Sequence, residues 1–534
     1  MTMIAPYRSD APPGRDGFWQ LLHAEWTKFR TVRGWVIGLV VALIVTAGIG
    51  LLSSGGSTSV CQQASGGAGA QSASSSAGGS ACMASFPLGP GGEPVSDGFY
   101  FVRQPLTGNA SITVRVTSMT GLLPPENDNG PNPTRPGLVD WAKAGIIIKE
   151  NLKQGSAYAA MMVAAGHGVR MQWNYTGDTA GQPGAAGPAN PRWLRLTRSG
   201  DVLTGYDSTD GTHWTRVGTV TLTGLPSTVQ AGLFTASPDY NQETQNFGGG
   251  VNAGGGPTEA TAVFDNISGL SGPLAGGYVG SPEIPGVGSY HVAGGTYTVT
   301  GGGDIAPIPA GHGGPADAAA TISGYLLGTF AGLIALAVIA AMFMTAEYRR
   351  NLIRVTLAAS PRRDRVLAAK AVVIAAVSFV VGVAGAAIAV LLGSAITHAR
   401  HYYAFPVSAM TEVRMIIGTG VLAAVAAVLA LAIGSIVRRS AAAVAIVIVV
   451  IVLPFFLAVA AVVPLGAADW LLRITPAAGF ALQGAYPQYG QVQMIYSALS
   501  GYYPLSSWAG FLVLCGWTAV ALAAAGYLLR RRDA

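Results

Sequence analysis

Long apolar segments near both ends of the chain constrain its fold more strongly than any other feature of the sequence. One follows the N-terminal region, and five more come after residue 320. Each is about as long as a helix must be to cross a hydrocarbon core of ~30 Å. The expected spans are 35–52, 322–344, 366–396, 413–437, 441–463 and 508–529. This pattern predicts a polytopic α-helical membrane protein with six transmembrane helices.

Composition agrees with a membrane protein. Of the 534 residues, 50% are hydrophobic and only 10% are charged, whereas a soluble domain carries about 25% charged residues. The formal net charge of +6 does not indicate nucleic-acid binding. The basic residues crowd at the edges of the spans, where membrane topology explains them.

Basic clusters predict the orientation of the chain, because positive charge beside a span resists translocation. Five basic residues precede the first span, Arg438 and Arg439 lie between the fourth and fifth, and residues 530–532 follow the sixth. Seven more lie in residues 346–370, between the second and third spans. Both termini are therefore expected in the cytoplasm, and the segment between the first two spans is expected outside it.

The stretch between the second and third spans also carries an apolar component that a charged tether would not need. Ser360-Pro361 is expected to end a short helix there, because the residue before proline disfavours the α region. A short helix held between two spans could dock onto a soluble partner. Alternatively, the arginines of this stretch only set the orientation of the chain in the membrane. The apolar residues are Leu352, Ile353, Val355, Thr356 and Leu357.

The N-terminal region precedes the first span, which we place at residues 34–53. Residues 1–16 are polar and are expected to form a disordered cytoplasmic tail. Residues 17–33 combine aromatic side chains at helical spacing with basic neighbours, which predicts an amphipathic helix in the lipid interface. The basic lead of a signal peptide is the alternative, although no clear Ala-x-Ala pattern follows. The key interfacial residues are Trp19, Trp26, Phe29, Arg30 and Arg33.

Residues 54–83 have the Gly, Ser and Ala composition of a linker. Cys61 and Cys82 lie near its ends, in a segment expected outside the cytoplasm, where disulfides persist. A disulfide between them would close a loop of about 20 residues and stabilise by roughly 3 kcal/mol. Two free thiols are the alternative. Cys515 lies in an apolar span and is expected to pack without reacting.

Residues 84–306 differ in character from the rest of the chain. Short β-branched and aromatic segments alternate with Gly, Pro, Asn and Asp turns, which predicts an all-β sandwich. Residues 209–212 are expected to form a hairpin turn. A linker at 307–320 leads to residues 321–534, which hold the other spans and a cytoplasmic loop at 345–366. The expected strands are 99–102, 111–117, 144–149, 158–163, 168–174, 193–197, 202–206, 215–222, 229–234, 262–267 and 296–300.

The sequence of this region does not predict a catalytic or metal site. Glycoside hydrolysis needs two carboxylates about 5–10 Å apart across a cleft, and no such pair is marked. His167 and His213 show no metal-ligand spacing. A sugar-binding platform would need exposed aromatic side chains, although large aromatics are usually buried. The candidates for such a platform are Trp173, Trp193, Tyr206 and Trp214.

Several runs in this region resemble the concanavalin A-like jelly roll appended to many bacterial glycan-active proteins. They are residues 141–149, 191–200, 206–214, 231–237 and 263–267. The resemblance implies a jelly-roll fold inserted between the first two spans. That fold hosts sugar binding, catalysis and plain interaction, so it does not fix a ligand.

The spans and their flanks resemble the ABC-2 type permeases, the membrane subunits of bacterial ABC exporters. The matching runs are Glu25-Trp-Thr-Lys-Phe-Arg-Thr-Val-Arg33, Glu347-Tyr-Arg-Arg, Ile353-Arg-Val-Thr-Leu357 and residues 361–370. In that family the loop after the second span contacts the ATPase. The resemblance implies this coupling role for Glu347, Tyr348, Arg349, Arg350, Ile353, Arg354, Thr356 and Leu357.

No Gly-x-x-x-x-Gly-Lys-Ser/Thr phosphate loop occurs in the chain. The chain is therefore expected to be no enzyme and to hold no cofactor, with ATP and Mg²⁺ on a separate ATPase subunit. Two permease chains, identical or not, would assemble in a bacterial plasma membrane and contact its lipids, with a glycan as a further partner of the sandwich. The alternative is a membrane-anchored glycan-binding or sensing protein, for which two spans would suffice.

Overall fold

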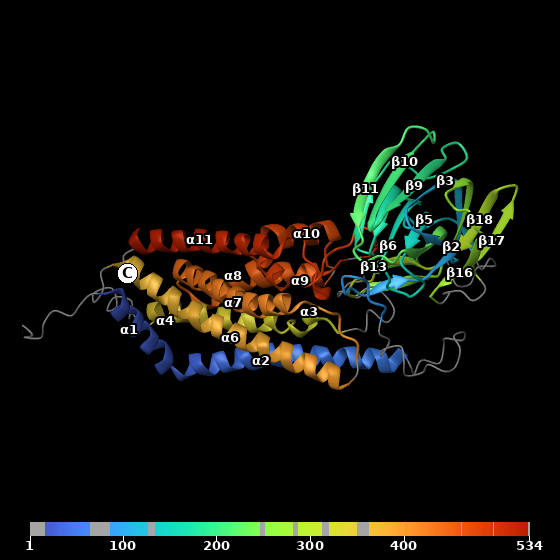
Figure 1. Ribbon diagram of the computed structural model, residues 1–534. Helices are drawn as coiled ribbons and strands as arrows, with labels where there is room; N and C mark the ends of the chain where they lie inside the picture. Colours follow the sequence, from blue (N-terminus) through green and yellow to red (C-terminus); the bar gives the residue numbers. More distant parts are fainter. Residues whose placement is uncertain are drawn as a thin grey trace, which may run out of the picture.

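The computed structural model divides the chain into a helical bundle and a β-sandwich at one end of it (Figure 1). Helix α1 and the C-terminal end of α11 lie at the opposite end of the bundle. The described residues are 17–64, 86–125, 134–245, 251–280, 287–311, 320–349, 362–400, 402–460, 462–494 and 496–531.

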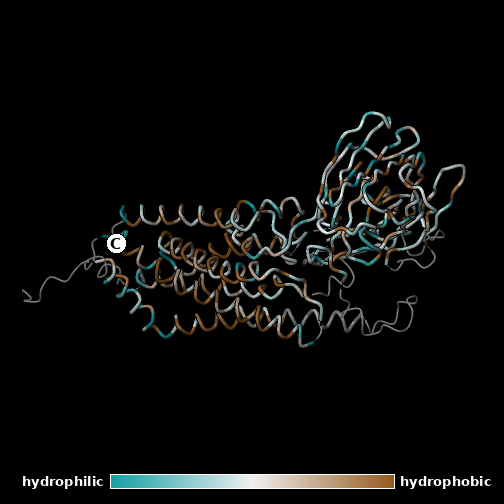
Figure 2. The backbone as a smooth tube through the Cα atoms, viewed as in Figure 1, coloured by the Kyte–Doolittle hydropathy of each residue, from teal (hydrophilic) through white to brown (hydrophobic). Residues whose placement is uncertain are grey.

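Six helical segments in the described residues are long and apolar enough to cross a membrane, as predicted. Figure 2 shows their hydrophobic residues along the whole length of the bundle, with hydrophilic residues at its ends. The helices are α1 (Phe18–Thr31), α2 (Arg33–Ala64), α3 (Ile322–Tyr325), α4 (Thr329–Arg349), α6 (Arg363–Ala399), α7 (Ala409–Val437), α8 (Ser440–Val447), α9 (Leu453–Val459), α10 (Leu465–Ile474) and α11 (Ser507–Arg531).

Helix α2 differs from its predicted bounds. It continues as helix to Ala64, into the region expected to be a Gly/Ser linker. Cys82 and most of that linker lie outside the described residues, as does the side chain of Cys61, so the expected disulfide stays a prediction. Among the described cysteines, Cys515 is free.

The fifth span is interrupted near Pro454. A π-helical turn, η2 (Ile448–Val452), joins α8 to α9, and Pro454 lies in the first turn of α9. Proline lacks the N–H group that an α-helix needs and clashes with the preceding turn. The wider turn accommodates this break without ending the span.

The segment after α10 returns into the bundle. The 3₁₀ helix η3 (Pro476–Gln483) is buried at every residue. The side-chain amide of Gln483 donates to Thr329 Oγ1 at 3.0 Å and to Thr419 Oγ1 at 2.9 Å. These bonds tie the segment to α4 and α7 inside an apolar core, where an unpaired amide would be costly.

The sandwich consists of two antiparallel sheets that enclose a core of aliphatic, Met and aromatic side chains. One sheet has the order β11-β10-β9-β3-β15-β18-β17, with β4 (Arg135–Pro136) paired to β3. Its other strands are β3 (Ala110–Leu123), β9 (Arg192–Ser199), β10 (Val202–Ser208), β11 (Thr215–Thr221), β15 (Glu259–Ser268), β17 (Ser289–Ala293) and β18 (Thr296–Gly301).

The second sheet has the order β16-β2-β12-β5-β6-β7-β8. Its strands are β2 (Phe99–Thr107), β5 (Lys143–Lys149), β6 (Tyr158–Ala164), β7 (Gly168–Trp173), β8 (Gly177–Ala180), β12 (Thr228–Ala236) and β16 (Ala275–Val279). A separate hairpin joins β13 (Tyr240–Gln245) to β14 (Val251–Gly256). This architecture fits the inserted jelly roll that the sequence resemblance implied.

All eleven predicted strands overlap observed ones, and residues 209–214 connect β10 to β11 as the turn prediction required. The strands that were not predicted are short or glycine-rich. In β14 and β16, for example, glycine replaces the β-branched residues on which the prediction depended.

The chain enters and leaves the sandwich through neighbouring strands. β1 (Val95–Asp97) pairs with β19 (Ile305–Pro307), next to the bundle. Buried lysines attach this ribbon to β5: Lys149 Nζ lies 2.7 Å from Asp97 Oδ2, and Lys143 Nζ lies 2.7 Å from Asp304 Oδ1. Burial lowers the pKa of Lys149, although Asp97 opposes the shift.

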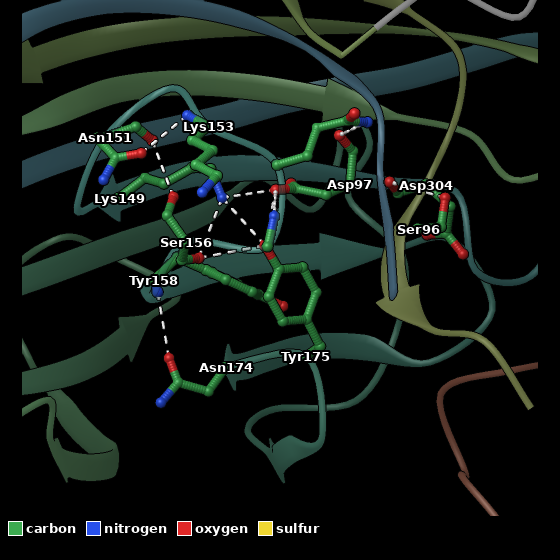
Figure 3. A network of polar contacts seen from close by, with 12 residues as sticks. Ser96, Asp97, Lys149, Asn151, Lys153, Ser156, Tyr158, Asn174, Tyr175 and Asp304 are labelled. Atoms are coloured by element: carbon green, nitrogen blue, oxygen red, sulfur yellow. Dashed lines mark hydrogen bonds and ion pairs between the residues drawn. The ribbon is translucent and has the colours of Figure 1, made fainter. Parts of the chain in front are cut away.

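Tyr175 completes the polar network around Lys149 (Figure 3). Its hydroxyl donates to Asp97 Oδ2 at 2.7 Å, and Lys149 Nζ also donates to Ser156 O at 3.2 Å. Tyr175 and the preceding Asn174 both have positive φ values, 63° and 44°. Few residues other than glycine adopt this conformation, and here the surrounding hydrogen bonds hold it.

The turn at Asn174 and Tyr175 also connects the sandwich to the bundle. Gln491, from the segment after η3, donates its side-chain amide to the backbone oxygen of Tyr175 at 2.8 Å. A second contact is an aromatic cluster in which Phe86, Tyr403 and Phe405 meet one another. The N–H of Phe405 also donates to Ala320 O, just before α3.

Candidate functional site

The end of the bundle opposite the sandwich is where the sequence predicted a docking loop. Helix α4 ends at Arg349, and α6 begins at Arg363. The residues between them, 350–361, lie outside the described residues. Helix α1 crosses the bundle at this end (Figure 1). The ends of the predicted loop are therefore held by the packing of α1, α4 and α6.

A buried cation lies at the centre of this packing. Lys370, two turns into α6, is fully buried. Its Nζ atom donates to Glu25 Oε2 at 2.6 Å and to Glu347 Oε1 at 2.7 Å. The ring of Phe343 lies 4.5 Å from the same ammonium group. One side chain from α6 thus binds α1 and α4 at once.

Lys28 balances the charge of this group. It lies one turn after Glu25 on α1, and its Nζ atom is 2.8 Å from Glu25 Oε1 and 3.2 Å from Glu347 Oε1. Burial alone would lower the pKa of Lys28, but its hydrogen bonds and charge interactions with Glu25 and Glu347 together raise it. We call Glu25, Lys28, Glu347 and Lys370 the charge cluster; it holds two carboxylates and two ammonium groups.

Aromatic rings pack beside the charge cluster. Phe29 is 2% exposed and stacks on Trp35 with ring centres 5.5 Å apart. Phe343 meets both rings edge to face, at 5.4 Å and 5.1 Å. The rings exclude water from one side of the ion pairs, which strengthens the attraction between the charges.

Further contacts fix the two ends of the predicted loop. On α4, the ring of Tyr348 lies 4.9 Å from the guanidinium of Arg438, which caps α7 with a φ of 59°. On α6, Arg363 donates to Leu529 O near the end of α11. Asp364 forms an ion pair with Arg530 at the surface. The loop ends therefore contact α7 and α11 as well as α1.

The structure describes only part of the predicted coupling residues. Glu347 and Tyr348 lie in the site as described above, and Arg349 ends α4. Arg350, Ile353, Arg354, Thr356 and Leu357 lie outside the described residues.

The predicted interfacial helix has two different faces. Trp19 and Trp26 are exposed, at 77% and 43%, whereas Phe29 is buried in the bundle. Arg30 and Arg33 are exposed. Phe29 contacts Trp35 and Phe343 inside the bundle, whereas the two tryptophans are exposed; the interfacial placement of the helix stays a prediction.

Sequence reasoning did not identify Glu25, Lys28 and Lys370 as a site. The available signal was the i, i+3 spacing of Glu25 and Lys28 among aromatics, together with a lone lysine between Ala369 and Ala371. Lys370 was interpreted as one of many topology-marking basic residues. Nothing in the sequence paired it with an acid more than 300 positions away.

In the sandwich, three of the four predicted platform residues gather and one does not. Trp193 and Tyr206 come from β9 and β10, which are neighbours in one sheet, and Trp214 directly precedes β11, the next strand of that sheet. Trp173 belongs to β7 in the other sheet and packs against the core between the sheets. Among the described residues, no group of three His, Cys, Asp or Glu side chains is placed to hold a metal ion.

Comparison with solved structures finds only weak likeness. A functionally unknown protein from Saccharomyces cerevisiae has 15% identity, with 33% of this chain and 76% of that chain covered and a TM-score of 0.19. Scytalido-glutamic peptidase has 10% identity, 40% and 98% coverage and a TM-score of 0.22. Values this low support no conclusion about function. Among curated proteins, none matches the chain.

Comparison with protein families gives a match over almost the whole chain. The model described as "ABC-2 family transporter protein" matches residues 19–534. The match includes α1, all six spans and the inserted sandwich. It agrees with a transport role for the bundle. The chain therefore belongs to the ABC-2 transporter family.

Proposed function

We propose that this chain is the membrane-spanning permease subunit of an ATP-driven exporter, moved by a separate ATPase chain that binds ATP and Mg²⁺. The observation that carries the proposal is the charge cluster. It joins α1, α4 and α6 at the ends of the segment that would contact the ATPase. A force on that segment would therefore move three helices together.

The chemistry of the charge cluster suits a rigid connection between these three helices. A buried ion pair adds little stability compared with apolar packing, because both charges lose their hydration. It does impose one arrangement, since each carboxylate must meet its ammonium partner. Lys370 satisfies that requirement only when α1 and α4 are both in place.

The arrangement of the chain supports the proposed sidedness. Helix α1 and the C-terminal ends of α4 and α11 lie at one end of the bundle, and the sandwich lies at the other (Figure 1). Basic residues crowd at the first end, so we place that end in the cytoplasm of a bacterial cell. The sandwich would then meet the cell envelope or the exported substrate.

A second permease chain completes the proposed complex. Only 22% of the apolar windows of α2 and α11 is buried within the chain. These helices therefore present apolar surface that lipids or a second copy would cover. Family membership supports a dimeric permease with two ATPase subunits.

The proposal can be tested by co-purification with candidate ATPases, beginning with any encoded beside this gene. Reversing the charges of Arg349, Arg350 and Arg354 should abolish co-purification, because the docking segment would repel its partner. Arg531→Glu, at the same end of the bundle but over Tyr527 of its own helix α11, is the matched control and should leave the complex intact. Retention of the ATPase by the triple variant would refute the docking role.

A further inference from the structure

In the part of the chain that the structure describes, other segments cover one of the two outer faces of the sandwich. The outer face of the β2–β12–β5–β6 sheet is covered by β1, β19 and the turn at Tyr175, which form a second apolar core on it. Gln491 of the bundle binds that turn directly. The other sheet, with β9, β10 and β11, forms the upper side of the sandwich in Figure 1, with β11 nearest to α10. A ligand of the sandwich would therefore meet this second sheet.

The strand register places aromatic and basic side chains together on that open face. In β9, Leu194 and Leu196 point into the core, so Trp193 and Arg195 point outward. Tyr206 of β10 is directly opposite Arg195 and Arg216. We call Arg115, Trp193, Arg195, Tyr206, Trp214 and Arg216 the Trp193 face.

Guanidinium groups stack on the indole rings of this face. Arg115 lies 5.6 Å from the ring centre of Trp193, and Arg195 lies 3.8 Å from that of Trp214. A guanidinium held over an aromatic ring keeps N–H groups at its edge that can bind a further partner. Such N–H groups suit bidentate binding of a carboxylate or phosphate.

Two of the three arginines keep their charge available. Arg115 is neutralised by Asp265, with two hydrogen bonds. Arg195 donates to the hydroxyl of Thr113, and within the described part of the chain neither it nor the exposed Arg216 forms a salt bridge. Asp210, on the adjoining hairpin, is already occupied by His213 and by two backbone N–H groups.

We propose that the Trp193 face binds an anionic polysaccharide, with a sugar ring against Tyr206 and acidic groups on Arg195 and Arg216, while Trp193, between Arg115 and Gly211, supports the face from below. The inference rests on the proposed function, because it requires the sandwich to face the envelope. Unpaired guanidinium groups between aromatic rings favour a charged glycan over a neutral one, since a neutral sugar would leave both charges without a partner.

The test is binding by the full-length protein in lipid nanodiscs, measured by biolayer interferometry. The probes are polygalacturonate, poly(glycerol phosphate), neutral dextran and vesicles containing phosphatidylglycerol. We expect one of the two anionic polymers to bind, with an affinity that falls at higher ionic strength. The polymer that binds identifies carboxylate or phosphate as the recognised group.

Variants then locate the site. Arg195→Gln with Arg216→Gln should weaken binding by roughly tenfold or more, because two charge-assisted hydrogen bonds are lost. Lys153→Gln, on an exposed loop of the other sheet, should leave binding unchanged. Thermal melting of each variant confirms that the sandwich is intact. Binding of neither anionic polymer, equal binding by the double variant, or binding of lipid vesicles alone would overturn the proposal.

These outcomes are independent of ATPase co-purification. If the protein fails to bind polysaccharide but still forms the ATPase complex, only the binding role of the Trp193 face is refuted. If it binds polysaccharide but forms no ATPase complex, only the permease assignment is refuted.

Discussion

At the scale of single residues, the charge cluster is defined by its balance. Lys370 and Glu25 are fully buried, and Glu347 is 7% exposed. Removing one member leaves an uncompensated charge in an apolar surrounding, which costs far more than the intact pair contributes. The cluster should therefore tolerate paired changes better than single ones.

Lys370→Met tests this balance. The variant leaves Glu25 and Glu347 to share Lys28, and we expect a loss of about 3–5 kcal/mol. Glu347→Gln combined with Lys370→Met restores equal charges and should recover part of the loss. Thermal unfolding of the detergent-purified protein measures both. A double variant no more stable than the single one would contradict the charge-balance explanation.

Glu93 gives a pH-dependent prediction at the junction between the sandwich and the bundle. Burial raises the pKa of Glu93 above 4.5, and its Oε1 atom has no hydrogen-bond partner. Burial, with the charge of Glu93 adding to it, raises the pKa of Tyr489 to about 12. The folded protein therefore favours the protonated form of Glu93. Protonation raises the free energy of unfolding below pH 4.5, and this gain is lost as the pH rises through the folded-state pKa.

Glu93→Gln should therefore melt at a higher temperature than the unaltered protein at pH 7. The difference should shrink as the pH approaches 4.5, because the original carboxyl becomes neutral as well. Glu259→Gln, at the start of β15 in the sandwich, is the control variant. A difference in melting temperature that stays constant between pH 7 and pH 4.5 would show that Glu93 does not act through its charge.

At the scale of elements, the sequence predicted the helices and the longer strands well. Each span was visible because its apolar run exceeds the membrane thickness, and each long strand because β-branched residues repeat between turns. The bonds of Gln483 to Thr329 and Thr419 could not be predicted, because they join three elements far apart in the chain. The same is true of Lys370 and Glu25 in the candidate site.

Close packing between elements can be tested on two glycines of α11. A Cβ atom at Gly510 would lie 2.2 Å from Ala478 O of η3, whereas one at Gly516 would meet nothing within 4 Å. Gly510→Ala should cost roughly 1–3 kcal/mol by overpacking. Gly516→Ala should be neutral or stabilise by up to about 1 kcal/mol, as expected for an exposed helical position. Equal melting temperatures for the two variants would argue against the close packing of η3 on α11.

At the scale of the whole molecule, the sandwich is a complete domain inserted between two spans. It has its own core between its sheets and a second core under β1 and β19. Its first and last strands pair with each other, so the domain closes upon itself before the chain returns to the membrane.

Residues 95–307 should therefore fold when expressed alone. We expect a soluble product with a β-type circular dichroism spectrum and one cooperative thermal transition. Lys149→Met within this fragment should lower the melting temperature, because it leaves Asp97 buried without its ammonium partner. An aggregated or non-cooperative fragment would mean that the contact of Gln491 with Tyr175 is needed for folding.

The pairing of β1 with β19 also has a consequence for how such a transporter can evolve. Since the two connections emerge side by side, the distance between the first and second spans does not depend on the size of what is inserted there. An ancestral permease could have acquired, enlarged or exchanged this module without moving a single membrane helix.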